Sequence, residues 1–165
     1  MFSHKNLAGL AAGFSGASLV LAYGIEYYFQ LTPCPLCLLQ RYIFFAHLGI
    51  FGLGFIILKK DFFNPCLAFL AFLFGLLGLG LAGRHIWLQH LPADQVPYSC
   101  LASLEQLFHA LPLTTFLYRI FQGGSECAKV DFTFLGLSIP WWSSIGYLCL
   151  TIISLILLVT KSNQR

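Results

Sequence analysis

The sequence predicts an all-α integral membrane protein built as a bundle of four transmembrane helices. Of its 165 residues, 58% are hydrophobic and only 9% are charged, whereas soluble domains contain about 25% charged residues. Four apolar segments are each long enough to cross a bilayer core, which needs roughly 20 helical residues. Because irregular backbone cannot face lipid, we expect each segment to be a helix. The net charge of +3 is small and the basic residues are scattered, so nucleic-acid binding has no support.

The four predicted spans are nearly free of charge, and they make the whole chain, residues 1–165, a single membrane domain. The first span is interrupted only by Glu26, and the third is uncharged until Arg84. Lys5 ahead of the first apolar run is a feature of secretory signal peptides, but this run is long and lacks a small-residue cleavage site, so we interpret it as a span. The predicted spans are Leu7–Phe29, Leu38–Leu58, Cys66–Leu88 and Trp141–Thr160.

Lysine and arginine residues set the predicted orientation, because they are enriched in cytoplasmic loops. Four spans place the N-terminus, the second connection and the C-terminus on one side of the membrane. We therefore expect both termini to be cytoplasmic, with loops of about residues 30–37 and 89–140 on the opposite side. The basic residues of the cytoplasmic segments are Lys5, Lys59, Lys60, Lys161 and Arg165.

This topology sorts the six cysteines. Cys34 and Cys37 fall at the outer end of the second span, and Cys100 and Cys127 fall in the long outer loop. Cysteines in an oxidising compartment can form lasting disulfides. The other two cysteines lie at the inner end of the third span and within the fourth, and we interpret them as small apolar packing residues: Cys66 and Cys149.

The Cys34-Pro35-Leu36-Cys37 motif at a predicted helix start is the strongest chemical signal. The positive end of the helix dipole favours a thiolate, and such motifs often lower a cysteine pKa. Arg41 lies four residues after Cys37, so both project from one helix face. An arginine at this depth is costly unless it has a function. It either stabilises the Cys37 thiolate or negative charge on a bound acceptor, or it extends to the lipid headgroups.

Cys-x-x-Cys motifs also occur in zinc sites and structural disulfides. The four outer cysteines, with Cys100 and Cys127 as the second pair, could in principle bind zinc. The second pair is too widely spaced for a zinc ribbon, and an apolar helix end is a poor setting for one. We therefore expect redox chemistry and no metal, with a non-enzymatic metal-binding or structural membrane protein as the alternative.

The long outer loop contains two predicted short helices that suit the membrane interface or the surface of the bundle. The second runs from Leu113 to Phe121, and Gly123-Gly124-Ser125 then predicts a flexible stretch before Cys127. Aromatic residues from Phe132 to Trp142 predict an interfacial belt that leads into the last span. The first predicted helix carries an apolar stripe of Leu101, Leu104, Leu107, Phe108 and Leu111.

Taken in order, the motifs resemble the disulfide-bond formation protein B (DsbB) family over nearly the whole chain. Each motif is weak alone, and their combination, spacing and four-span topology carry the resemblance. The motifs are Cys34-Pro35-Leu36-Cys37 with Arg41, Arg84-His85-Ile86-Trp87-Leu88-Gln89, Cys100, Gly124-Ser125-Glu126-Cys127-Ala128 and Phe134-Leu135-Gly136-Leu137-Ser138-Ile139-Pro140.

The resemblance implies an enzyme of the bacterial inner membrane, a protein-dithiol:quinone oxidoreductase. Members of the family reoxidise DsbA, a periplasmic thioredoxin-fold disulfide oxidase, and pass two electrons to ubiquinone or menaquinone. By motif position, Cys34 and Cys37 would be the quinone-coupled pair. Cys100 and Cys127 would be the pair that faces the partner in the periplasm.

The same resemblance implies quinone-binding roles for Arg41, beside the quinone ring, and for His85. Family members often have Glu before this arginine, and here the residue is Gln40, so it receives no acid–base role. Glu26 matches no family motif and is interpreted as a charge at the outer interface. A vitamin K epoxide reductase-like enzyme would share the chemistry, but its Cys-x-x-Cys lies near the last span, so the motif order argues against it.

Overall fold

A computed structural model of the chain describes residues 4–57, 64–92, 95–96, 112, 114–115, 118, 121, 123–130 and 132–162. Long helices dominate this part of the chain, and a short helix and a small hairpin precede the last of them. The elements are α1 (His4–Phe29), α2 (Pro35–Ile57), α3 (Pro65–Gln89), α6 (Ser125–Ala128), β1 (Thr133–Phe134), β2 (Leu137–Ser138) and α7 (Ile139–Ser162).

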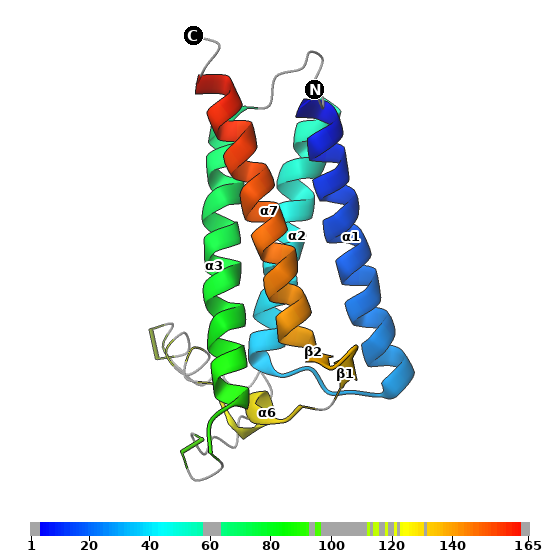
Figure 1. The fold of residues 1–165 in the computed structure, drawn as a ribbon, viewed down its shortest axis with the longest axis vertical. Coiled ribbons are helices and arrows are strands. Elements are labelled where there is room, and N and C mark those ends of the chain that lie inside the picture. The colour runs from blue at the N-terminus through cyan, green and yellow to red at the C-terminus, as the bar shows by residue number, and fades with distance from the viewer. Residues whose placement is uncertain are drawn as a thin grey trace.

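Helices α1, α2, α3 and α7 are long and apolar enough to cross a membrane, which confirms the predicted four-span bundle. Each begins one to three residues before the predicted span. In α2 and α3 the extra residues include a proline at the first helical position, Pro35 and Pro65. Proline is favoured there, because the first turn has no use for its missing N–H group. Figure 1 shows that α1 begins and α7 ends at the same end of the bundle, as the predicted topology requires.

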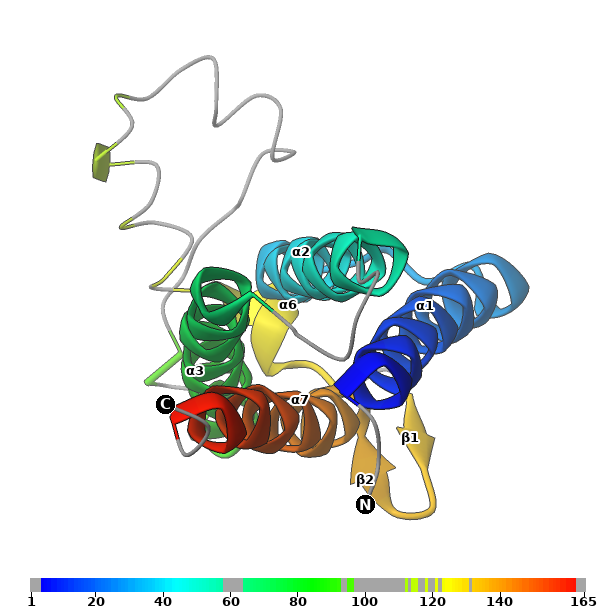
Figure 2. The same cartoon turned by 90° about the horizontal axis from the view of Figure 1, so that it is seen from above.

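The helices pack as two pairs joined along one side. The most extensive contacts join α3 to α7 and α1 to α2, and α2 also packs against α3. In contrast, α1 and α7 contact each other little. The view along the bundle in Figure 2 shows the α3–α7 pair beside α2, with α1 diverging from its neighbours. A cavity lined by residues of α1, α2 and the first turn of α7 lies at the end of the bundle that carries α6.

Two glycines allow α3 and α7 to approach closely. Gly75 lies against Thr151, and a Cβ atom added at Gly78 would lie 2.6 Å from Cδ1 of Tyr147. Helices in lipid gain little from burying apolar surface against each other, so close contact at small residues is a main source of their affinity. Gly80 lies on the same helix with no atom near its Cβ position.

The β1–β2 hairpin is a feature that the all-α prediction did not include. Thr133 pairs with Ser138, and Leu135 and Gly136 form the turn with φ angles of 52° and 80°. The Trp142 indole N–H donates a hydrogen bond of 3.1 Å to the Phe134 carbonyl and ties the hairpin to α7. The exposed rings of Phe134 and Trp142 lie at this end of α7, where an aromatic interfacial belt is predicted.

The predicted loop helix over residues 101–111 lies outside the described residues. Within the second predicted helix, Leu113–Phe121, the structure describes four residues, and all four are helical: Thr114, Thr115, Tyr118 and Phe121.

We expect Gly78→Ala to lower the free energy of unfolding by about 1–3 kcal/mol, because the added methyl group overpacks against the buried Tyr147 ring. Gly80→Ala is the matched control, since nothing lies within 4 Å of its Cβ position. Thermal unfolding followed by circular dichroism in detergent measures both variants. Equal melting temperatures for the two would contradict the assigned contact.

Candidate redox site

The start of α2 positions the Cys34–Cys37 pair. The Cys34 carbonyl accepts a hydrogen bond from the Leu38 N–H (3.1 Å), and the Cys34 sulfur accepts one from the Cys37 N–H (3.3 Å). Cys34 therefore caps the helix with both its backbone and its side chain, as N-cap residues do. Pro35 occupies the first helical position. The motif thus places one cysteine at the cap and the other in the first turn.

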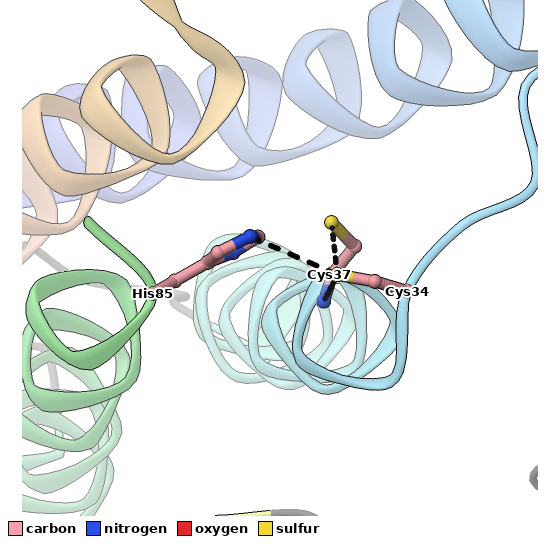
Figure 3. A group of neighbouring side chains, drawn as sticks. All are labelled: Cys34, Cys37 and His85. Atoms are coloured by element: carbon pink, nitrogen blue, oxygen red, sulfur yellow. Dashed lines mark hydrogen bonds between the residues drawn. The ribbon is translucent and has the colours of Figure 1, made fainter. Parts of the chain in front are cut away.

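The two sulfurs of the motif face each other and a histidine from another helix. The Sγ atoms of Cys34 and Cys37 are 2.9 Å apart, and Nε2 of His85 on α3 is 3.8 Å from the Cys34 sulfur. Figure 3 shows the three side chains pointing toward one another. A disulfide has an S–S bond of about 2.05 Å, so closing one here requires the sulfurs to approach by roughly 0.9 Å. The site can therefore carry dithiol–disulfide chemistry.

Cys127 joins this group from a distant part of the sequence. Its side chain lies in hydrogen-bonding contact with the Cys34 thiol, and its backbone lies beside the His85 ring. Both Cys34 and Cys127 are buried. The structure thus brings a cysteine of the long loop to the Cys-x-x-Cys motif.

Gly123 allows α6 to carry Cys127 to this position. Its φ angle of +68° lies in the left-handed region that favours glycine, and an added Cβ would lie 2.5 Å from Cδ1 of Leu88. Gly123 and Gly124 are both buried. The predicted flexible stretch is therefore a tightly packed turn, in which glycine is required for its backbone angle and its close approach to α3.

The hydrogen bonds of Cys34 to the sulfurs of Cys127 and Cys37, together with burial, raise the pKa of the Cys34 thiol well above its ordinary value. At neutral pH the Cys34 sulfur therefore holds its proton. Within this group, the Cys34 thiol is therefore a hydrogen-bond donor, and the neighbouring sulfurs accept.

A buried polar chain links His85 to α7. The side-chain amide nitrogen of Gln40 lies 3.5 Å from Nδ1 of His85, and the Tyr147 hydroxyl donates a hydrogen bond of 2.5 Å to the Gln40 backbone carbonyl. All three residues are buried. Buried polar groups in an apolar medium need partners, and Gln40 gives the His85 ring a polar neighbour on the side away from Cys34.

Arg41 is held by an acidic partner rather than extending freely to the headgroups. Its guanidinium forms an ion pair with the Glu26 carboxylate of α1 and lies over the Tyr23 ring, 4.7 Å from the ring centroid. The two charged side chains are only 12% and 28% exposed. Mutual neutralisation makes both charges tolerable at this depth. The interpretation of Glu26 as a simple interfacial charge missed this contact.

A cavity of about 620 Å³ opens beside the redox group. Its walls come from α1, α2, the end of α3, the hairpin and the first turn of α7, and they are mostly apolar. Cys34, Cys37 and His85 line it, as do both members of the Arg41–Glu26 pair. Ligand sites commonly have apolar walls with a few polar groups in fixed places. The cavity can therefore hold a small apolar molecule against the cysteine pair.

The structure brings together five of the six residues predicted for the site. Cys100, the sixth, lies outside the described residues. Three further contributors were not assigned from the sequence: Glu26, Gln40 and Tyr147. A lone acidic residue in an apolar span and a lone arginine in the next one were the available signal for the ion pair. Cys66 and Cys149 are exposed on the outside of the bundle rather than packed within it.

Comparisons with known proteins identify close relatives. A family model described as "Disulfide bond formation protein DsbB" matches residues 4–157. The chain is 44% identical over 147 residues to a protein of Nitrosococcus oceani named "Disulfide bond formation protein B", covering 87% of this chain and 85% of that one. It is 41% identical over 160 residues to the protein of that name from Acinetobacter baumannii, covering 93% and 90% of the two chains.

We expect Cys34 of the reduced protein to react with iodoacetamide only at a higher pH than an ordinary thiol, because its raised pKa keeps it protonated. Cys127→Ala removes the hydrogen bond that contributes most to the shift, so the pH of half-reaction at Cys34 should fall. Mass spectrometry of alkylated peptides measures this, with exposed Cys66 as the internal reference. An unchanged half-reaction pH in the variant would contradict the Cys34–Cys127 contact.

Proposed function

The chain belongs to the disulfide-bond formation protein B (DsbB) family, and we propose that it oxidises the dithiol of a periplasmic DsbA-like oxidase and passes the two electrons to membrane quinone. Family membership assigns the protein an oxidoreductase role in disulfide bond formation, and its four spanning helices make it a multi-pass membrane protein. The partner, the acceptor and the residue roles below are parts of the proposal.

The placement of Cys127 against Cys34 carries the proposal. A relay by thiol–disulfide exchange requires a sulfur of one pair to reach a sulfur of the other. Cys127 is buried in contact with the Cys34 thiol, which is itself 2.9 Å from the Cys37 sulfur. These contacts support transfer between a loop pair, Cys100–Cys127, and the membrane pair, Cys34–Cys37.

The first exchange loads electrons onto the loop pair. A thiolate of the reduced partner attacks Cys100 of the Cys100–Cys127 disulfide, forming a mixed disulfide and releasing Cys127 as a thiolate. The second thiolate of the partner attacks its own sulfur in the mixed disulfide. The partner leaves with an internal disulfide, Cys100 leaves as a thiolate, and the loop pair has gained two electrons.

The second exchange moves those electrons to the membrane pair. The Cys127 thiolate attacks Cys34 of the Cys34–Cys37 disulfide, releasing Cys37 as a thiolate in the first turn of α2. The Cys100 thiolate then attacks Cys127 and restores the loop disulfide. Cys34 departs and takes up a proton, in agreement with its raised pKa.

The cavity fits a quinone by size, by its apolar walls and by its contact with the cysteine pair. When bound there, a quinone supplies a two-electron acceptor, which lets the Cys34–Cys37 disulfide re-form. Arg41 offers guanidinium N–H donors and a positive charge to a polar ring substituent, while Glu26 holds that guanidinium on the cavity wall. His85 offers a further polar group beside Cys34.

Energetics favour quinone over a thiol pool as the final acceptor. DsbA-type oxidases have potentials near about −120 mV, and for a two-electron couple each 30 mV is worth about 1.4 kcal/mol. An ordinary thiol pool is too reducing to keep such a partner oxidised. A membrane quinone supplies the driving force, and its apolar character accounts for an oxidoreductase within the bilayer.

The proposed location is the bacterial inner membrane, with the cysteines of the site facing the periplasm. The start of α1, which contains Lys5, and the end of α7, which contains Lys161, lie at the same end of the bundle, opposite α6 and the hairpin. Positive residues favour the cytoplasmic side, and an oxidising periplasm suits working disulfides.

We expect Cys34, Cys37, Cys100 and Cys127 to be protected from alkylation in native membranes, to react after a reduced DsbA-like partner is added, and to be protected again when quinone is present. Cys100→Ser should remove the mixed disulfide with the partner, and Cys34→Ser or Cys37→Ser should abolish quinone reduction. Peptide mapping of the alkylated sites measures these changes.

Persistence of the mixed disulfide in Cys100→Ser would overturn the assigned entry point. Four cysteines that never change state would exclude the relay and favour a non-enzymatic metal-binding or structural protein.

Arg41→Ala should raise the KM for quinone about tenfold or more, since hydrogen bonds to charged groups contribute about 1.5–3 kcal/mol. Arg41→Lys retains the charge and should recover part of the loss. A single turnover of oxidised enzyme with reduced partner, in the absence of quinone, is the control and should keep its rate. An unchanged KM in Arg41→Ala would indicate that Arg41 serves only to anchor the helix.

A further inference from the structure

The sulfurs of the redox pair and the imidazole of His85 form a cluster with the chemistry of a metal site. One ligand atom from each of Cys34, Cys37 and His85 lies within 4.8 Å of the other two. Cys34 and His85 are buried, and Cys37 is partly buried. The argument against zinc from the sequence rested on the wide Cys100–Cys127 spacing and the apolar helix end, and it did not consider His85, which is 51 residues from Cys34 in the sequence.

We propose that the site in its dithiol state binds one thiophilic divalent cation, of the Zn²⁺ and Cd²⁺ class, through Cys34, Cys37 and His85. Cys127, whose side chain contacts Cys34 but lies outside this close group, moves toward the ion as the fourth ligand. The disulfide state cannot bind it, because both sulfurs of the pair are then bonded to each other. Cation binding and disulfide formation are therefore alternatives at one site. No electron transfer is involved, since the thiols lose only protons as they bind the metal.

The three close ligands lie at separations near those of three corners of a tetrahedral site. Zn–S and Zn–N bonds of about 2.3 Å and 2.0–2.1 Å place neighbouring ligand atoms roughly 3.4–3.8 Å apart. The distance from the Cys34 sulfur to Nε2 of His85 is 3.8 Å. The Cys34–Cys37 distance of 2.9 Å needs to widen by about 0.9 Å for both sulfurs to bind one ion.

Gln40 completes the surroundings of the histidine. A metal-bound histidine usually donates its other ring N–H to an oxygen, which fixes the ring orientation. The Gln40 amide lies beside Nδ1 of His85, at 3.5 Å, and an amide flip presents its oxygen to that N–H. A hydrogen bond from Tyr147 to the Gln40 backbone holds this residue in place.

Access and charge also suit a cation. All three core ligands line the cavity of about 620 Å³, which provides a path to the site. Three thiolates and one divalent cation carry a net charge of −1. The Arg41–Glu26 pair on the same cavity wall is neutral as a whole, so it does not repel an incoming cation.

Occupancy by the cation would stop the enzyme in its reduced state. A thiolate bound to metal is not free to attack, and the pair cannot close a disulfide until the cation leaves. This inhibition rests on the proposed function, whereas the binding itself rests only on the cluster. The two can therefore be measured separately.

Cd²⁺ is the direct probe, because it is redox-inert and its thiolate complexes absorb in the ultraviolet. The full-length protein in detergent is reduced with a phosphine. The reductant is then removed under anaerobic conditions, and the protein is titrated with Cd²⁺. We expect one Cd²⁺ per chain with charge-transfer absorption from three thiolates, competition by Zn²⁺, and no binding after the protein is oxidised. Binding by the oxidised protein, or no stoichiometric binding by the reduced one, would overturn the proposal.

Variants separate this site from adventitious thiols. His85→Ala should weaken Cd²⁺ binding by about 100-fold and Gln40→Leu by about tenfold, in line with losses of 10–100-fold for outer-sphere partners alone. The Cys127→Ala variant should still bind Cd²⁺, but its charge-transfer absorption per bound ion should fall to that of two thiolates. Cys66→Ser and Cys149→Ser, which alter exposed cysteines away from the cluster, are the matched controls and should bind as wild type does.

Equal losses in these controls and in Cys34→Ser would overturn the assigned ligands. Alkylation mapping of each variant in the same samples reports whether its thiols are present and reactive. If Cd²⁺ binds as expected while quinone fails to reoxidise the cysteines, the proposed function fails and the metal site stands. If the relay operates and no cation binds, the metal site is excluded and the proposed function stands.

Discussion

The hydrogen bond from the Tyr147 hydroxyl to the Gln40 carbonyl, 2.5 Å long, crosses from α7 to α2 in the interior of the bundle. The same side chain makes further contacts between helices. The Tyr147 ring fills the space above Gly78 of α3 and stacks on Phe44 of α2 with the ring centroids 4.4 Å apart. In a membrane no water replaces a lost partner, so one side chain sets the spacing of three helices. The Gln40 side chain, from the same residue of α2, lies beside the His85 ring of α3.

Three polar residues of the spans lie where the proposed chemistry would take place. Glu26, Arg41 and His85 all line the cavity beside the cysteines, and each has a partner from a different helix. This pairing reduces the cost of placing polar groups near lipid. It also means that the charge at the cavity wall is set by two residues together, because removing either member leaves the other uncompensated in an apolar setting.

Hydropathy located the helices to within three residues, since each span must be continuously apolar to cross lipid. Local spacing also placed Arg41 on the Cys37 face of α2. The sequence does not predict contacts between helices. Nothing in the spacing of Glu26, Gln40 or Tyr147 indicates which side chain of another helix each residue contacts. The resemblance named Cys127 and His85, but their position against Cys34 depends on how α3 and α6 pack. Gly123 illustrates the same limit, because flexibility and a packed left-handed turn both favour glycine.

The sparse contact between α1 and α7, with the cavity lying between them, has a consequence for how this protein meets an apolar molecule. A compound that enters this cavity from the bilayer arrives by two-dimensional diffusion among the lipids. Its effective concentration is then its mole fraction in the membrane rather than its amount per litre of buffer. When more lipid or detergent is added at a fixed amount of such a compound, its mole fraction falls, and so does its effective concentration at the protein. An affinity measured in micelles is therefore meaningful only when the amount of detergent accompanies it.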